Sequence, residues 1–182
     1  MPRIPPIRGK QDMAPEHQHL IDEALDIFGA VRGPTSMLLH SPALAGLVLP
    51  MVRAFRETCV VADQPRVLGI LALVRERGSA YVWSAQVGYA RRVGLPEALI
   101  DLLRAQGDPS VLAAEERDII LYSRQLARCN RVDHALFDAM LARHGQQWMV
   151  EFTTAINFYG MLCGITNAFD VDAQEGGDRL PS

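Results

Sequence analysis

Apolar residues recur every three or four positions along most of the chain, a spacing that predicts helices rather than strands. The pattern is clear in the segment that begins at Pro15 and runs to about Val31. Its apolar stripe consists of Leu20, Ala24, Leu25, Ile27 and Phe28. No convincing strand pair or hairpin turn interrupts the helical segments. We therefore predict an all-α fold, a bundle of eight to ten helices.

Prolines, glycines and small polar residues mark where these helices begin and end. Ser41 before Pro42 is a strong helix start, and Pro50 should kink or split the helix that follows. Gly78 ends one helix and Ser79 caps the next. The predicted helices cover about 15–31, 42–59, 63–77, 79–94, 96–107, 113–129, 133–144 and 147–168.

The flanking segments differ from the helical part in composition. Residues 1–13 contain three prolines and show no periodic spacing of apolar residues, which predicts an extended arm. Residues 172–182 form a polar tail. We predict one helical domain over 14–171, since 182 residues is an ordinary length for a single domain.

Charge and cysteine content exclude several classes of protein. With 18 basic and 21 acidic residues the net charge is −3, so no electrostatic footprint for nucleic acid is expected. Three well-separated cysteines and an N-terminus without an apolar core favour a reducing, cytoplasmic location. The most apolar long stretch, 148–169, contains Glu151, Asn157 and Asn167, which favours a buried helix over a membrane span.

One helical face carries an unusual set of polar side chains. Ser79, Val82, Gln86 and Tyr89 follow one another at spacings of three, four and three, which places them on the same face. Of these groups only the Tyr89 phenol titrates, ordinarily near pH 10. The face is thus either an active site or a former one.

Other candidate chemistry is weaker. The five histidines form no zinc motif, and no metal or cofactor is expected; His40, in "MLLHSP", could cap a helix or line a pocket. Glu115 and Glu116 are adjacent and should point apart. Buried packing is the expectation for Cys129 and Cys163. Tyr81 and Trp83 could be core or subunit contacts, or the wall of a ligand cavity.

Three separated segments together resemble one known family. They are "PRVLGILALVRERGSAYVWSAQVGYARRVGLPEALIDLLRAQG", "RGPTSMLLHSPALAG" upstream and "NFYGMLCGITNAFDV" downstream. They are similar to the carboxymuconolactone decarboxylase family, relatives of alkylhydroperoxidase D. Segments that align with the family's R-E-L, Y-E-W-x-x-H, G-x-Y and N-A-F patterns follow one another in the family's order, and the resemblance covers residues 4–171. It implies an alkylhydroperoxidase D-like helical bundle.

Under this resemblance the family's working residues are replaced. The glutamate of R-E-L falls on Val67, and the histidine falls on Gln86. The two peroxidase cysteines fall on Ser79 and Val82, and Val82 also takes the position of the glutamate in Y-E-W. The glycine of G-x-Y falls on Asn157. None of these replacements exchanges a proton or an electron near neutral pH.

The resemblance leaves three functions open. The first is a divergent lyase or isomerase acting on a small organic acid or lactone, with catalytic roles for Gln86, Tyr89 and His40. The substrate-binding residues would be Ser79, Tyr81, Val82, Trp83, Val67, Asn157 and Tyr159. The second is a non-catalytic subunit for small-molecule binding or assembly. The third, an alkylhydroperoxidase or peroxiredoxin-type activity, is least favoured because the motif thiols are missing.

The expected partners are a small-molecule ligand and further copies of the chain. The family usually forms dimers to hexamers, and the high apolar content is compatible with a homo-oligomer. No nucleic acid or membrane partner is expected.

Overall fold

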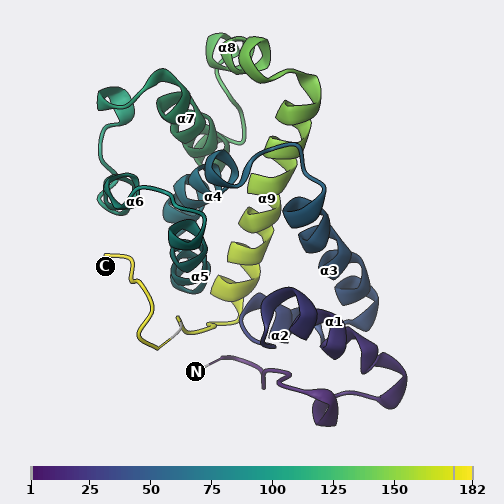
Figure 1. Cartoon of the computed structure of the whole chain (residues 1–182). Helices are drawn as coiled ribbons and strands as arrows, with labels where there is room; N and C mark the ends of the chain where they lie inside the picture. The colour runs from purple at the N-terminus through teal and green to yellow at the C-terminus, as the bar shows by residue number, and fades with distance from the viewer. Residues whose placement is uncertain (1, 174, 182) are drawn as a thin grey trace. The chain divides into compact units, whose positions relative to one another are not determined.

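The computed structural model describes residues 2–173 and 175–181, and within them the prediction of an all-α fold is confirmed. Nine α-helices and no strand occur in this part of the chain (Figure 1). The helices are α1 His19–Phe28, α2 Pro34–Leu38, α3 Pro42–Glu57, α4 Asp63–Arg77, α5 Ala80–Arg92, α6 Glu97–Arg104, α7 Ala114–Cys129, α8 His134–His144 and α9 Gln146–Ala168. Residues 1, 174 and 182, which belong to the predicted arm and tail, lie outside the described residues.

Contacts between Cα atoms divide the chain into two compact units. Unit 1 comprises residues 1–59 and 165–172, and unit 2 comprises residues 60–164 and 173–182. Helix α9 therefore contributes to both. A single domain over 14–171 stays a prediction, because two compact units can belong to one domain.

Unit 1 has its own apolar core, built where α1 and α3 pack together. The N-terminal arm takes part in it: the Ile7 side chain is buried, and its backbone N–H donates to the Ser36 carbonyl over 3.2 Å. A 3₁₀ turn at Lys10–Asp12 interrupts the arm. The fully or nearly buried members of this core are Ile7, Leu20, Ile21, Ala24, Leu39, Ala45 and Leu49.

The expected break at Pro50 is wrong, because α3 runs without interruption from Pro42 to Glu57. Proline removes one backbone hydrogen bond and crowds the carbonyl four residues earlier, here that of Gly46. Buried Ala45, Leu49 and Val52 lie on both sides of this point. Their burial on both sides of Pro50 offsets the lost hydrogen bond, so the helix is not split there.

Unit 2 is organised around α4. Every residue from Arg66 to Val74 is buried, and α4 packs against α5, α6 and α7 (Figure 1). Its two ends are as predicted: it starts at Asp63, and Gly78 ends it in the left-handed conformation at φ +61°. Helix α4 is therefore the buried centre of unit 2, against which α5 packs.

None of the helices in the described residues is long and apolar enough to cross a membrane. Within the same residues, no group of three or more histidine, cysteine or acidic side chains is placed to hold a metal ion.

Candidate functional site

The polar face of α5 is formed as its sequence spacing predicts. Ser79 is the N-cap of α5 and fully buried, and its Oγ accepts from the Val82 backbone N–H over 3.3 Å. Val82, Trp83 and Gln86 are buried farther along the same helix. On the neighbouring helix α4, Val67 has no exposed surface. Of the positions that the resemblance assigns to substrate, those on α4 and α5 are thus buried, whereas Asn157 and Tyr159 of α9 are half-buried.

Gln86 has the most informative environment on this face. Only 8% of the residue is exposed, and its Oε1 atom has no hydrogen-bond partner among the described residues. Asn157, an expected partner, instead donates through Nδ2 to the backbone carbonyl of Thr153, 2.9 Å away. A buried acceptor without a donor costs about 1–3 kcal/mol. The Gln86 amide therefore has an unmet need for an N–H or O–H donor.

Ser84 is a second buried polar group on α5 that lacks a partner in the described part of the chain. It is 6% exposed and its Oγ accepts and donates no hydrogen bond there. Positions two apart on a helix point to different sides, so Ser84 and Gln86 do not share one site. Ser84 was not predicted as a site residue, because a lone serine in a helix usually bonds to its own backbone.

The Cys163 thiol lies beside Ser79, which under the resemblance occupies the position of the first peroxidase cysteine. Cys163 of α9 is 1% exposed, and a side-chain hydrogen bond joins it to Ser79. Burial raises the pKa of the Cys163 thiol to about 12, although the Ser79 hydroxyl acts in the opposite direction. The thiolate is the reactive form, so Cys163 is a weak nucleophile at neutral pH.

The remaining cysteines lie elsewhere. Cys129, expected to be buried, is exposed, because it is the last residue of α7 and follows the buried turn of that helix. Cys59 is half-buried and belongs to unit 1.

Tyr89 is the titratable group on the α5 face. Its hydroxyl donates to Asp63 Oδ1 over 2.9 Å, and Asp63 also pairs with the buried Arg66. Burial is the largest cause that raises the pKa of Tyr89, and the Asp63 carboxylate raises it further. The phenol therefore stays protonated at neutral pH and serves as a hydrogen-bond donor rather than a base.

The other predicted residues have varied surroundings. Trp83 has no exposed surface and donates through Nε1 to Asp178 Oδ1, 2.9 Å away. Tyr81 is 8% exposed, and half-buried Tyr159 makes an edge contact with Phe158 at 5.8 Å between ring centroids. His40 is exposed in unit 1, where its Nε2 lies 2.8 Å from the Pro5 carbonyl. Its catalytic role stays a prediction.

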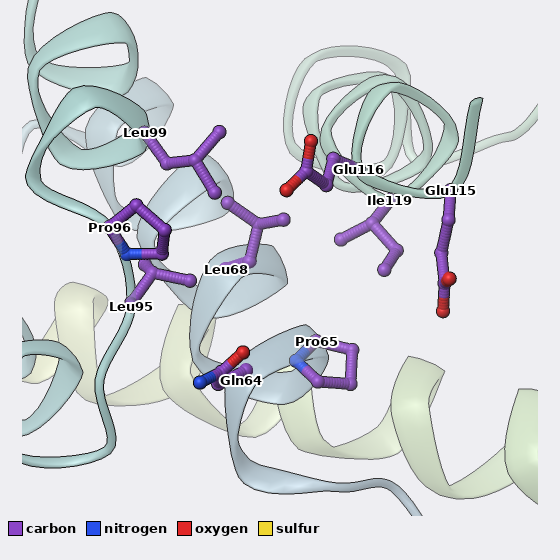
Figure 2. Close-up of a pocket in the computed structure, with 9 residues that line it drawn as sticks. All are labelled: Gln64, Pro65, Leu68, Leu95, Pro96, Leu99, Glu115, Glu116 and Ile119. Carbon is purple, nitrogen blue, oxygen red and sulfur yellow. The ribbon is translucent and has the colours of Figure 1, made fainter. Parts of the chain in front are cut away.

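A separate pocket of about 220 Å³ lies beside α4 (Figure 2). Apolar side chains line most of it, and Figure 2 shows the carboxylates of Glu115 and Glu116 on either side of Ile119. The lining residues are Gln64, Pro65, Leu68, Leu95, Pro96, Leu99, Glu115, Glu116 and Ile119. Two carboxylates repel an anion, so this pocket is a poor site for an organic acid. None of the residues predicted from the sequence to bind substrate lines it.

Comparison with known proteins identifies the fold. The apo crystal structure of the debrominase Bmp8 superposes with a TM-score of 0.72 at 14% identity, over 92% of this chain and 91% of that one. The two chains share one fold. A cysteine-to-alanine variant of Bmp8 in complex with 2,3,4-tribromopyrrole gives a TM-score of 0.74 at 13% identity, over 96% and 94% of the respective chains. No protein-family model and no curated protein matches the chain.

Proposed function

We propose that this protein binds a small organic acid or lactone at the Gln86 face of α5 and acts on it as a divergent lyase or isomerase. One observation carries the proposal: the buried Gln86 Oε1 atom has no hydrogen-bond partner among the described residues. A substrate O–H or N–H would supply the missing donor and recover the free energy that the unmet acceptor costs.

The shared fold supports a small-molecule site. Bmp8, whose backbone superposes on this chain, is a debrominase that has been crystallised with a tribromopyrrole. A pyrrole offers one N–H donor on a compact ring, which is the kind of group that a buried amide oxygen accepts. The same acceptor suits the hydroxyl of an enol or of a hydroxy acid.

The proposed chemistry depends on hydrogen bonds rather than on a strong acid or base. Gln86 would act through both ends of its amide. Oε1 would accept from a substrate O–H or N–H, and Nε2 would donate to a substrate oxygen, a contribution of up to about 3–4 kcal/mol when the charge develops only in the transition state. Tyr89 would donate a proton, with Asp63 as its hydrogen-bonded partner. Asn157 and Tyr159 of α9 would bind the substrate, Ser79, Val82 and Val67 would form the floor of its site, and Tyr81 and Trp83 its walls.

A non-catalytic binding subunit is the alternative, and one observation favours it. Tyr89 on this face and Cys163 of α9, which is hydrogen-bonded to Ser79, both have raised pKa values and are neutral near pH 7. A general base works best with a pKa near the operating pH. The same facts make a thiol peroxidase the least favoured function.

The test uses a carboxylated five-membered lactone that also carries a free hydroxyl group; calorimetry measures its binding and ultraviolet absorbance its turnover. We expect Gln86→Leu to abolish binding, whereas Gln125→Leu, which changes a half-buried glutamine of α7, retains it. Binding with turnover supports the lyase or isomerase, and binding without turnover supports the subunit. Equal lactone affinity in Gln86→Leu and the parent chain would overturn the proposed site.

A further inference from the structure

A carboxylate from the chain's own C-terminal tail is held by three side chains of α5 and α6. Asp178 Oδ1 accepts from Trp83 Nε1 over 2.9 Å and from Arg104 Nε over 3.3 Å. Its Oδ2 accepts from Arg104 Nη2 over 2.9 Å and from Arg91 Nη2 over 3.0 Å. The Asp178 side chain is only 11% exposed. Four hydrogen bonds therefore enclose a single carboxylate.

The two arginine donors have partners besides the tail. Trp83 is buried in α5. Arg91 makes two hydrogen bonds to Glu97, at 2.6 and 3.0 Å, and Arg104 pairs with Asp101 within α6. Glu97 and Asp101 are about half exposed, so water screens their charges more than it screens Asp178. The two guanidinium groups are thus oriented before a third carboxylate arrives.

The segment that supplies Asp178 has little else to hold it. Residues 175–181 form no helix, and Glu175, Gly176, Arg179 and Pro181 are exposed. Segments with few buried contacts open at low free-energy cost. Release of this segment would leave Trp83, Arg91 and Arg104 as an open site with the geometry of a carboxylate.

We propose that Trp83, Arg91 and Arg104 form a carboxylate-binding site that the tail fills through Asp178, and that a small organic carboxylate binds there by displacing the tail. Indole N–H and paired guanidinium donors match the two oxygens of a carboxylate. This inference goes beyond the proposed function, because the site exists whatever Gln86 binds. It assigns the tail a role as an internal competitor.

Competition sets the size of the expected effect. A ligand that binds only the open form has its affinity reduced in proportion to the fraction of protein that is open. If the tail is docked nine-tenths of the time or more, its removal improves the apparent dissociation constant about tenfold or more.

The experiment uses benzoate as the probe and benzamide as the neutral control of the same shape. Trp83 fluorescence reports binding in a Trp148→Phe background, since the chain has two tryptophans. Four proteins are compared: the full chain, a chain that ends at Ala173, Asp178→Asn in the full chain, and Arg104→Gln in the shortened chain. If the shortened chain loses its helical circular dichroism, the comparison rests on Asp178→Asn, which keeps the tail, and the full chain.

We expect benzoate to bind about tenfold or more tightly to the shortened chain and to Asp178→Asn than to the full chain. Arg104→Gln should reverse that gain, and benzamide should bind all four proteins alike. Equal benzoate affinity in the full chain and Asp178→Asn overturns the competition. No preference for benzoate over benzamide once Asp178 is removed overturns the carboxylate site itself.

Discussion

Gly69 is the point at which α4 comes closest to its neighbours, and Gly69→Ala tests how tightly unit 2 is packed. A Cβ atom at this position would lie 2.5 and 2.6 Å from the Cζ and Cε2 atoms of Phe152 and 3.1 Å from Ser123 Oγ. The Phe152 ring has little freedom to move, because it is fully buried and stacks on Trp148 with ring centroids 4.6 Å apart. The added methyl group should therefore force a shift of the backbone.

Two opposing terms set the magnitude. Overpacking a core typically costs about 1–3 kcal/mol, and alanine in place of glycine inside a helix gains about 1 kcal/mol. Gly164→Ala is the matched control, because a Cβ at Gly164 of α9 meets no atom within 4 Å. We expect Gly164→Ala to be about 1 kcal/mol more stable than the parent chain and Gly69→Ala to be less stable than Gly164→Ala by about 1–3 kcal/mol.

Thermal and urea unfolding, followed by circular dichroism at 222 nm, measure both variants. For a chain of this size each kcal/mol corresponds to about 2–4 °C in Tm. If Gly69→Ala proves as stable as Gly164→Ala, the close packing of α4 against α9 inferred from these distances is refuted.

Three further predictions concern the candidate site. Gln86→Leu removes an acceptor without a partner and should raise the free energy of unfolding in urea by about 1 kcal/mol. Gln125→Leu removes the acceptor of a 2.7 Å hydrogen bond from the Asp133 backbone N–H and should lower that free energy by about as much. A loss of stability in both variants would show that the Gln86 amide is structural. With a thiol-specific reagent at pH 7, exposed Cys129 should react promptly and Cys163 only after denaturation, because burial raises the pKa of Cys163 to about 12; rapid modification of Cys163, identified by mass spectrometry, would contradict this. Burial acts to raise the pKa of Asp178, but its N–H donors outweigh burial and hold the pKa below the ordinary 3.8. The tail contact should therefore contribute stability above that pH and lose it as the pH falls through the lowered pKa. Trp83 fluorescence that changes near neutral pH instead would rule this out.

The helix boundaries were predictable where capping chemistry marks them. Gly78 ends α4 because glycine adopts the left-handed conformation easily. Ser79 and Asp133 begin α5 and α8 because their side chains accept hydrogen bonds from the first backbone N–H groups of those helices. Helix α2 was missed, since five residues from Pro34 to Leu38 are too few to show a period of 3.6. The Pro50 break was wrong because tertiary packing outweighs one lost hydrogen bond.

The candidate site was predictable only in part. Spacing along α5 places Gln86 on the face that starts at Ser79, and the structure buries both residues. Neither the hydrogen bond of Ser79 to Cys163 nor that of Trp83 to Asp178 has a sequence signal, since each joins residues more than 80 positions apart. Contacts at that separation arise from the packing of whole helices and of the tail.

The enclosure of α4 limits which side chains position 67 can hold. Val67 has no exposed surface. A glutamate at this position would bury a carboxylate, which would either raise its pKa until it is neutral or destabilise the fold by several kcal/mol. Proteins of this size have a margin of only about 5–15 kcal/mol. Val67→Glu is therefore expected to destabilise the chain strongly unless a partner for the new carboxylate is introduced with it.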